Sequence, residues 1–449
     1  MELQWDWSEI DLSEARFPED FLWGTATAAH QVEGGNTNNN WARWETETDK
    51  KGKPRIHGGQ RSGRACEHYE RYAEDFRRMK EDLGLKSYRF SIEWSRIEPE
   101  EGRFDEEAIA HYHGVIDCLN ELGIEPMVTL HHFTDPIWFA DKGSFEEKDN
   151  IDLFVRFARR CFEEYGAKVP RWCTHNECGP YSVMGWGFGV FPPGIKSFKR
   201  MARVLCNLMH SHVRVYRELK AMPGGDAVEI GLVKNIFQFD PMQSWNPIHT
   251  LMCRTMERVY NDSVIGFMKT GVFELRIPFM VRLREEVAVG EKFSDFVGLN
   301  YYSNLLIKMI MDASDPQALK IREGQIRTDF GYSTYPEGFY RAIMQISELG
   351  LPIYITENGI PDDKDDRRAD WIRRYGYAMW RAMQDGADVR GFHYWSLLDN
   401  FEWAEGYSMC FGLYAVDFET QERTLREGSL ALKELMASPL PPRSQPEPR

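Results

Sequence analysis

The sequence of 449 residues lacks a long apolar run, a glycine- or serine-rich linker and an excess of positive charge. No segment approaches the roughly 20 apolar residues that a membrane-spanning helix requires. The acidic first residues have none of the basic and then apolar pattern of a secretory signal. Lysine and arginine number 55 against 70 aspartates and glutamates, and the net charge of −15 disfavours nucleic acids and anionic membranes as partners. We therefore expect a cytoplasmic protein that binds neither.

Cysteine is also scarce, with eight residues spread from Cys66 to Cys410. In a chain of this length the spacing indicates reduced, mostly buried thiols and not a disulfide framework. Aromatic residues are abundant by contrast, because 14 Trp, 27 Phe and 19 Tyr make up 13% of the chain. This composition suits a large core, and surplus Trp and Tyr also suit the flat apolar faces of sugar rings.

The composition does not break between residues 17 and 436, so we predict one domain over residues 17–437. Residues 1–16 are expected to form an acidic lead-in. Residues 438–449, with five prolines in twelve, are expected to form a frayed C-terminal tail.

Apolar, strand-like runs alternate with amphipathic helical segments along this domain, which is the pattern of a parallel sheet covered by helices. The expected strands are 21–29, 86–94, 125–133, 172–177, 229–235, 293–302, 353–357 and 390–396. The expected helices are 67–83, 106–122, 151–165, 201–220, 259–270, 338–349 and 369–385. Residues 35–64 are expected to form a long loop. Eight strand and helix units close into a barrel, so we predict a single (β/α)8 TIM barrel with elaborated loops.

Polar side chains gather where these strands end, which is where such barrels hold their active sites. They are Gln31, Glu33, Arg89, Glu93, His131, His132, Asn176, Glu177, Asn300, Tyr301, Tyr302, Glu357, Trp395, Asp399, Asn400, Glu402 and Trp403. Glu357 follows a buried apolar run and is costly to desolvate, so it has either an ion-pair partner or a chemical task. Glu177 and Glu357 can face each other across the barrel mouth. Paired carboxylates with tryptophans predict glycoside hydrolysis, although residue types alone do not separate retention from inversion.

Seven motifs then carry a resemblance to a known family. They are FLWGTATAAHQVEG (21–34), YRFSIEWSRIEP (88–99), THNE (174–177), GLNYYS (298–303), YPEG (335–338), ITENG (355–359) and YWSLLDNFEW (394–403). In this order and over nearly the whole chain, they resemble the retaining β-glycosidases of glycoside hydrolase family 1.

The resemblance implies a role for each matching residue. Glu357 is the expected nucleophile and Glu177 the expected acid/base, which holds a proton at neutral pH because a second carboxylate is near. Arg89 and Asn300 are expected to support the nucleophile, and Tyr302 is expected to hydrogen-bond it. The residues expected to bind the sugar are Gln31, His132, Asn176, Tyr302, Trp395, Glu402 and Trp403, with Trp395 as the stacking floor and a cis Trp395–Ser396 peptide typical of the family.

Strict alternation along a strand sends Asn176 and Glu177 to opposite faces, so we expect strand 172–177 to twist or bulge near its end. The chain also departs from the family, since Cys178 replaces the proline that usually follows the acid/base, and Gly179 replaces a larger residue. We therefore expect a wider leaving-group side, lined by Tyr181, Trp186 or Phe188.

Three alternatives remain open. Cys173, His175, Glu177 and Cys178 suggest a metal site, but the second cysteine pair of zinc deaminases is absent, so no metal or cofactor is expected. A non-catalytic sugar-binding protein normally lacks one carboxylate, whereas both are present. A hydrolase of phosphorylated sugars usually replaces the acidic residue at 402, and Glu402 is retained. We expect an exo-acting β-glucosidase for β-glycosides or oligosaccharides, although the sequence does not separate glucosyl from galactosyl or fucosyl preference.

Overall fold

The computed structural model describes residues 3–308 and 320–443. Eight parallel strands form a closed barrel in the order β1-β10-β9-β8-β5-β4-β3-β2, which confirms the predicted (β/α)8 barrel. The strands are β1 (Leu22–Ala26), β2 (Ser87–Ser91), β3 (Glu125–His131), β4 (Arg171–His175), β5 (Glu229–Pro241), β8 (Phe296–Ile307), β9 (Ile353–Asn358) and β10 (Val389–Trp395).

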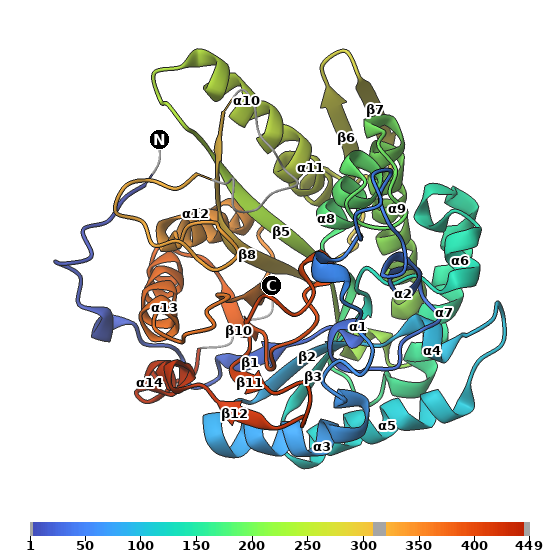
Figure 1. Ribbon diagram of the computed structural model, residues 1–449, viewed down its shortest axis with the longest axis horizontal. Helices are drawn as coiled ribbons and strands as arrows, with labels where there is room; N and C mark the ends of the chain where they lie inside the picture. Colours follow the sequence, from blue (N-terminus) through green and yellow to red (C-terminus); the bar gives the residue numbers. More distant parts are fainter. Residues whose placement is uncertain (1–2, 309–319, 444–449) are drawn as a thin grey trace.

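Helices surround the barrel, as Figure 1 shows. The principal ones are α3 (His68–Arg78), α5 (Glu106–Glu121), α7 (Ile151–Tyr165), α9 (Phe198–Ala221), α11 (Ser263–Thr270), α12 (Pro336–Ser347) and α13 (Arg368–Gln384). All seven predicted helices are therefore confirmed. Shorter helices are α1 (Ala29–Val32), α2 (Asn40–Trp44), α4 (Trp94–Ile97), α6 (Ile137–Asp141), α8 (Cys178–Ser182), α10 (Pro247–Glu257) and α14 (Ala431–Met436).

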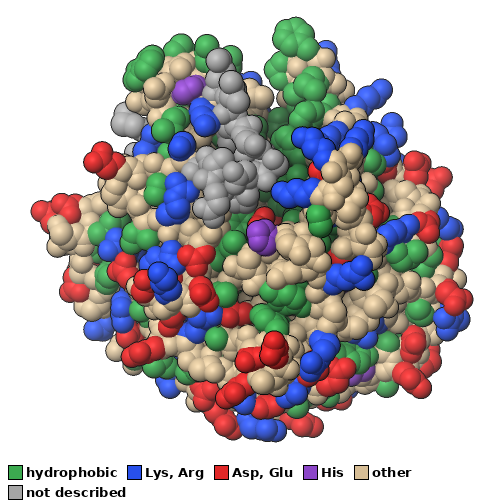
Figure 2. Space-filling model, in the orientation of Figure 1, with side chains coloured by type: hydrophobic (Ala, Val, Ile, Leu, Met, Phe, Trp, Pro, Cys, Tyr) green, Lys and Arg blue, Asp and Glu red, His purple; other side chains and the backbone are tan. Residues whose placement is uncertain are grey.

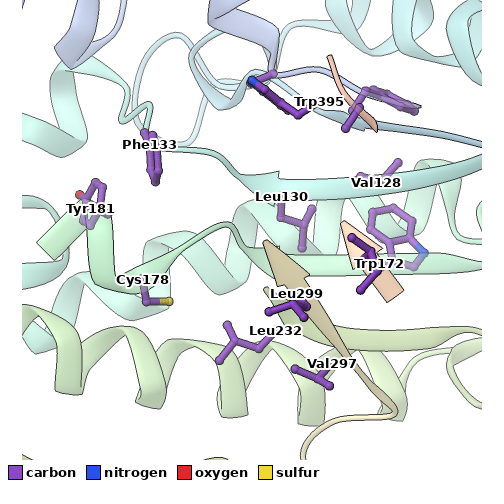
Figure 3. Packing of buried hydrophobic residues seen from close by; sticks show 14 of the residues in the cluster. Val128, Leu130, Phe133, Trp172, Cys178, Tyr181, Leu232, Val297, Leu299 and Trp395 are labelled. Atoms are coloured by element: carbon purple, nitrogen blue, oxygen red, sulfur yellow. The ribbon is translucent and has the colours of Figure 1, made fainter. Parts of the chain in front are cut away.

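Alternate residues along the strands build two separate cores. Met127, Cys173, Val233, Phe296 and Tyr354 pack together in one small cluster. Their neighbours along the chain belong to the large outer cluster, and Figure 3 shows some of them; these include Val128, Trp172, Leu232 and Val297. Because successive strand residues point to opposite faces, the two cores lie on the inner and outer sides of the barrel wall. The two-sided burial explains why these strands read as continuous apolar runs.

Several elements differ from the predicted outline. The expected loop 35–64 contains α2, whose N-cap Asn39 accepts a hydrogen bond from the Ala42 N–H. The strands β5 and β8 are longer than predicted and pair as far as Pro241 and Ile307. Two small antiparallel pairs were also not predicted: β6 (Val272–Ile277) with β7 (Val281–Glu286), and β11 (Tyr414–Val416) with β12 (Arg423–Leu425).

Two projections rise from one side of the molecule, formed by α10 and by the β6–β7 hairpin. Figure 2 shows apolar side chains at both tips. Trp245 and Leu251 are exposed at the first projection, and Phe279 and Met280 are exposed at the second.

Both ends of the described chain contact the barrel domain. The backbone N–H of Trp5 and the indole N–H of Trp7 donate to the Glu337 carboxylate at 3.0 and 2.9 Å. At the other end, the Leu440 N–H donates to the Phe17 carbonyl at 2.8 Å. The first part of the expected frayed tail is therefore attached, while residues 444–449 lie outside the described residues. Within residues 3–308 and 320–443, no helix has the length and apolar character to span a membrane.

Candidate active site

Glu357 reaches the barrel mouth from a bulge in β9. Asn300 of β8 pairs with Glu357 although Leu299 pairs with Ile355, so β9 has one extra residue there. The Glu357 side chain is 5% exposed. Its Oε1 accepts from Arg89 Nη1 at 2.7 Å, and its Oε2 accepts from the Tyr302 hydroxyl at 2.8 Å. The buried carboxylate thus has a cation on one oxygen and a neutral donor on the other, as predicted.

Glu177 is placed by a turn and not by a bulge. The strand β4 ends at His175 without a register shift against β3. The change of direction expected near the end of 172–177 is therefore present, but it lies in the turn after the strand and is not a bulge. Instead, Glu177 has left-handed backbone angles (φ 46°, ψ 64°) as the residue before α8. Its N–H donates to the Val233 carbonyl at 3.2 Å. This turn allows Asn176 and Glu177 to approach one site from the same strand end.

An amide network connects the two carboxylates. Asn300 Nδ2 donates to Glu177 Oε1 at 2.8 Å and lies 3.2 Å from Asn176 Oδ1. Asn176 Oδ1 also accepts from Arg89 Nη2 at 2.7 Å. Arg89 is fully buried, and its guanidinium therefore fixes Glu357 and Asn176 together. Glu177, by contrast, receives an amide N–H and has no guanidinium bound to it in the described chain.

The carboxyl groups differ electrostatically as a consequence. Burial raises the pKa of Glu357, while the Arg89 guanidinium and the Tyr302 hydroxyl oppose this effect. Burial and then the negative charge of Glu357 raise the pKa of Glu177 to about 8. Burial and then Glu357 also raise the pKa of Glu402 to about 8. Of the facing pair, Glu177 is therefore the group suited to carry a proton.

Gln31 and Glu402 form a polar wall beside the carboxylate pair. Gln31 Nε2 donates to Glu402 Oε2 at 3.1 Å and to Asn400 Oδ1 at 3.0 Å. The Gln31 Oε1 atom is buried and lacks a hydrogen-bond partner in the described structure. Such an acceptor is costly unless a ligand satisfies it, and a sugar hydroxyl has the required donor.

His132 presents a complementary donor. Its Nε2 lies 3.0 Å from Asn176 Nδ2 and acts as an acceptor, because the Asn176 oxygen is engaged by Arg89. Burial and the Arg89 charge hold the pKa of His132 well below its usual value, so the ring is neutral. Its buried Nδ1 has no partner among the described residues. Trp395 and Trp403 stack against the same ring, at centroid distances of 5.7 and 6.0 Å. The Trp395–Ser396 peptide is cis, as the family resemblance implied.

Other polar residues at the strand ends make contacts within the protein. His131 Nε2 lies 3.0 Å from Asp135 Oδ1, Glu93 accepts from the Ser95 hydroxyl at 2.6 Å and Asp399 pairs with Arg426 at 2.5 Å. These contacts satisfy the three side chains within the protein. Glu33 pairs with Arg96 at 2.9 Å, and the Tyr301 hydroxyl donates to the Tyr335 carbonyl at 3.0 Å.

Two of the three residues expected to line a wide leaving-group side do not do so, while Phe188 is partly exposed and stays a prediction. Tyr181 and Trp186 are buried and donate to Asp135 and Glu146 at 2.6 and 3.0 Å. A Cβ added at Gly179 would lie 3.6 Å from the Tyr260 ring. The ring of Tyr260, from a distant segment, therefore lies in van der Waals contact with the position that a side chain at 179 would occupy.

The suspected metal ligands do not converge. His175 contacts Ser211 at 2.9 Å and His131 at 3.4 Å, while Glu177 contacts Asn300. Cys206, His210 and Glu285 do offer ligand atoms within 4.8 Å of one another. However, Lys148 Nζ lies 3.1 Å from both His210 and Glu285, so an ammonium already supplies the positive charge there.

Lys234, a residue of β5 that is 2% exposed, was not among the predicted residues. A lysine inside the apolar run 229–235 was the available signal, since buried lysines are rare.

A closed (β/α)8 barrel with an asymmetric carboxylate pair and unsatisfied polar atoms at its mouth is typical of a glycoside hydrolase. The sequence profile of the family described as Glycosyl hydrolase family 1 matches residues 13–439. Beta-glucosidase A of Thermotoga maritima is 34% identical over 443 residues, which cover 92% of this chain and 96% of that protein. A 6-phospho-beta-galactosidase of Staphylococcus aureus is 31% identical over 472 residues, covering 93% and 97%.

Solved structures agree with this assignment. The beta-glycosidase from Pyrococcus horikoshii has a TM-score of 0.83 and 34% identity, over 94% of this chain and 95% of that chain. The beta-glucosidase from T. maritima in complex with glucoimidazole has a TM-score of 0.82 and 32% identity, over 94% and 99%. The chain belongs to glycosyl hydrolase family 1, as its motifs predicted.

Proposed function

We propose that the protein is a retaining exo-β-glucosidase, with Glu357 as the nucleophile and Glu177 as the acid/base. The observation that carries this assignment is the asymmetry of the pair. Glu357 is bound by the Arg89 guanidinium at 2.7 Å, whereas Glu177 receives the Asn300 amide at 2.8 Å. An ion-paired carboxylate suits attack, and a carboxyl group of raised pKa suits proton donation. The names of relatives, beta-glucosidase A among them, support glucosyl as the sugar.

In the first step, Glu357 attacks the anomeric carbon while Glu177 transfers its proton to the leaving oxygen. A covalent glycosyl-enzyme forms and the aglycone departs. In the second step, Glu177, now ionised, takes a proton from water, and the water oxygen displaces Glu357 from the same carbon. Two inversions give overall retention. Gln31 and His132 are the proposed ligands of the glucosyl hydroxyls, because each has a buried polar atom without a partner in the described structure. Glu402, which accepts from Gln31 at 3.1 Å, and Asn176, which lies 3.0 Å from His132, complete the proposed set.

The pH dependence of kcat/KM should have two limbs set by the pair. Activity requires Glu177 to be protonated, and its pKa is raised to about 8, so kcat/KM should fall as the pH rises through about 8. Activity also requires Glu357 to be ionised, and burial raises its pKa. The acid limb should therefore lie above the ordinary glutamate value of about 4.3. Initial rates with a nitrophenyl β-glucoside from pH 4 to 10 measure both limbs; a flat profile through pH 8 would argue against Glu177 as the acid.

Replacing Tyr302 by Phe removes the hydroxyl that donates to Glu357 Oε2 at 2.8 Å. A hydrogen bond to a charged group contributes about 1.5 to 3 kcal/mol, so kcat/KM should fall by about 10- to 100-fold. Steady-state kinetics on the folded variant measure the loss. A rate equal to that of the wild type would mean that this hydroxyl does not support the nucleophile.

We further propose that the sugar is unphosphorylated. The pKa of Glu402 is raised to about 8 because burial and the negative charge of Glu357 oppose its ionisation. The same surroundings disfavour a phosphate dianion on the ligand. No lysine occurs in the following segment 404–409. A comparison of nitrophenyl β-glucoside with its 6-phosphate tests this point, and a higher kcat/KM for the phosphate would reverse it.

The experiment for the proposed activity is a panel of nitrophenyl glycosides. The β-glucoside should be hydrolysed, with the β-galactoside and β-fucoside as weaker or comparable substrates, and the α-glucoside should be inert. Proton NMR of early reaction mixtures should show the β-anomer as the first product. Appearance of the α-anomer first would mean inversion and would overturn the mechanism.

We place the enzyme in the cytoplasm, a proposal that its eight free thiols support.

A further inference from the structure

Exposed apolar side chains gather on the two projections formed by α10 and the β6–β7 hairpin. Among the described residues, nine large apolar side chains are strongly exposed, and five of them lie on these projections. They are Trp245, Ile248 and Leu251 at the first tip and Phe279 and Met280 at the second (Figure 2). Single exposed apolar residues are normal on a protein surface, whereas gathered ones mark an interaction site.

Phe279 occupies a backbone position that normally takes glycine. The Met280 N–H donates to the Ile277 carbonyl at 3.0 Å and closes a turn over Pro278 and Phe279. Phe279 has a φ of 62°, and a turn with proline at its second position and a positive φ at its third favours Gly or Asn there. The Phe279 side chain is 108% exposed and therefore gains no packing in return. The folded chain by itself does not explain an aromatic residue at this tip.

Arginines follow the apolar residues along the exposed face of α10. Ile248, Leu251, Arg254 and Arg258 are all exposed, and their spacing of three or four residues places them on one face of the helix. The apolar pair lies at the N-terminal end, next to Trp245, and the arginines lie further along the chain. Within residues 3–308 and 320–443, Arg254 and Arg258 form no ion pair with a carboxylate.

The hairpin has the same order of residues from its tip. The apolar tip is followed by Arg276 and Arg282, which pair directly across the two strands. Arg284 lies on the same face of β7 as Arg282, and all three side chains are exposed. Like charges in directly opposed strand positions are destabilising. Arg276 pairs with Glu274, while Arg282 has no ion-pair partner in the described chain, so an anion bound here would relieve the repulsion.

The outer segments differ in charge from the protein as a whole. Residues 244–258 and 275–284 contain five arginines and one glutamate, whereas the whole chain has a net charge of −15. That glutamate, Glu257, accepts from Asn261 and Gln345 within the protein. The net charge of the chain predicts no affinity for anionic membranes. At physiological ionic strength, however, charges are screened over about 8 Å, so a surface in contact with the tips is affected mainly by their arginines.

We propose that the two tips bind an anionic lipid membrane, with Trp245, Phe279 and their apolar neighbours inserted among the lipids and the arginines on the lipid phosphates. Aromatic and apolar residues with flanking arginines are typical of segments that lie in a membrane interface. Both projections rise from one side of the molecule (Figure 1), so one flat surface can contact both. This attachment is independent of the proposed glucosidase activity.

A second copy of the chain fits the tips less well than a lipid surface does. A two-fold contact uses the same patch on both partners, so the arginines of one copy would face those of the other. Lipid phosphates carry the opposite charge, and lipid chains accept the apolar side chains.

The test is flotation of the purified protein with lipid vesicles. The wild type should float with vesicles of phosphatidylglycerol and phosphatidylcholine in equal parts and should stay unbound with phosphatidylcholine alone. Raising the salt concentration should release it, because salt screens the arginines from the phosphates. Absence of flotation with the anionic vesicles, or equal flotation with both kinds, would contradict the proposal.

Phe279→Gly is the sharpest variant, because glycine suits the positive φ and the hairpin should remain folded. Loss of the inserted ring should weaken binding to the anionic vesicles by about 10- to 100-fold. Joint replacement of Arg276 and Arg282 by Gln should weaken it by about 25-fold, since each arginine near such a surface contributes about fivefold.

Val289→Ser is the matched control. Val289 is 55% exposed, but it follows β7 at the end of the hairpin away from Phe279, so this variant should bind the vesicles as the wild type does. Hydrolysis of nitrophenyl β-glucoside at the wild-type rate should show that each variant is folded. Unchanged vesicle binding in both Phe279→Gly and the double arginine variant would assign the lipid contact to another surface and contradict the proposal.

Sedimentation without lipid distinguishes a protein partner from a membrane. The wild type and Phe279→Gly should sediment alike, because the tips are proposed to bind lipid and not a second copy. A wild-type dimer that is lost in Phe279→Gly would assign the tips to a contact between copies and would overturn the lipid proposal.

Discussion

Glu357→Ala is expected to lower kcat for nitrophenyl β-glucoside by about 10⁴-fold or more, since removal of a catalytic nucleophile has effects of this order in other hydrolases. The reason is chemical and not structural. The carboxylate bound by Arg89 at 2.7 Å and by Tyr302 at 2.8 Å is the group proposed to form the covalent bond. Steady-state and single-turnover rates on the folded variant measure the loss.

Two further measurements make this result specific. Azide can occupy the space left by the Glu357 carboxylate, and attack from that face should restore turnover with α-glucosyl azide as the product.

Glu93→Gln is a matched control, because Glu93 is also a buried carboxylate near a strand end but accepts hydrogen bonds from Ser95 and Thr134. That variant should hydrolyse at close to the wild-type rate. Substantial activity in Glu357→Ala without azide would exclude Glu357 as the nucleophile.

Glu177→Ala is expected to have an effect that depends on the leaving group. Substrates with poor leaving groups need protonation and should lose about 10²- to 10⁴-fold in rate, the usual contribution of general acid catalysis. Dinitrophenolate departs from a dinitrophenyl β-glucoside without being protonated, so the rate of the first step with this substrate should change little. The second step, which needs a base, should become slow, and a burst of dinitrophenol should precede a slow steady state.

Azide again distinguishes the two carboxylates. In Glu177→Ala it attacks the glycosyl-enzyme from the leaving-group side and should give β-glucosyl azide, opposite to the product of Glu357→Ala. Equal losses for good and poor leaving groups, with no burst, would show that Glu177 is not the acid/base. The raised pKa of Glu177, about 8, is consistent with a group that holds a proton at neutral pH.

Much of this site could be predicted because a (β/α)8 barrel has its active site at the carboxyl ends of its strands. Burial of the strands on both faces produced apolar runs that end in polar residues, and the carboxyl ends of all strands meet at one mouth. Glu177, Glu357 and Arg89 therefore come together although they lie far apart in the sequence.

The features that were missed have different physical causes. Gly179 suggested an open pocket, but Tyr260, about eighty residues further on, packs beside it. Glu177 has left-handed backbone angles, and the alternation of side chains along a strand does not predict them. The β6–β7 hairpin was not predicted because its side chains alternate between partly buried and exposed positions and lack the apolar run of a barrel strand.

The covalent intermediate tests the central claim most directly. In a dinitrophenyl 2-deoxy-2-fluoro-β-glucoside, the fluorine should slow both steps, while the good leaving group keeps the first step faster than the second. The glycosyl-enzyme should therefore accumulate. Mass spectrometry of a protease digest should then find the fluoroglucosyl group on the peptide that contains Glu357, with one group per chain and slow reactivation in buffer. A label on a peptide containing Glu177 or Glu402, or turnover with no label, would contradict the proposed nucleophile.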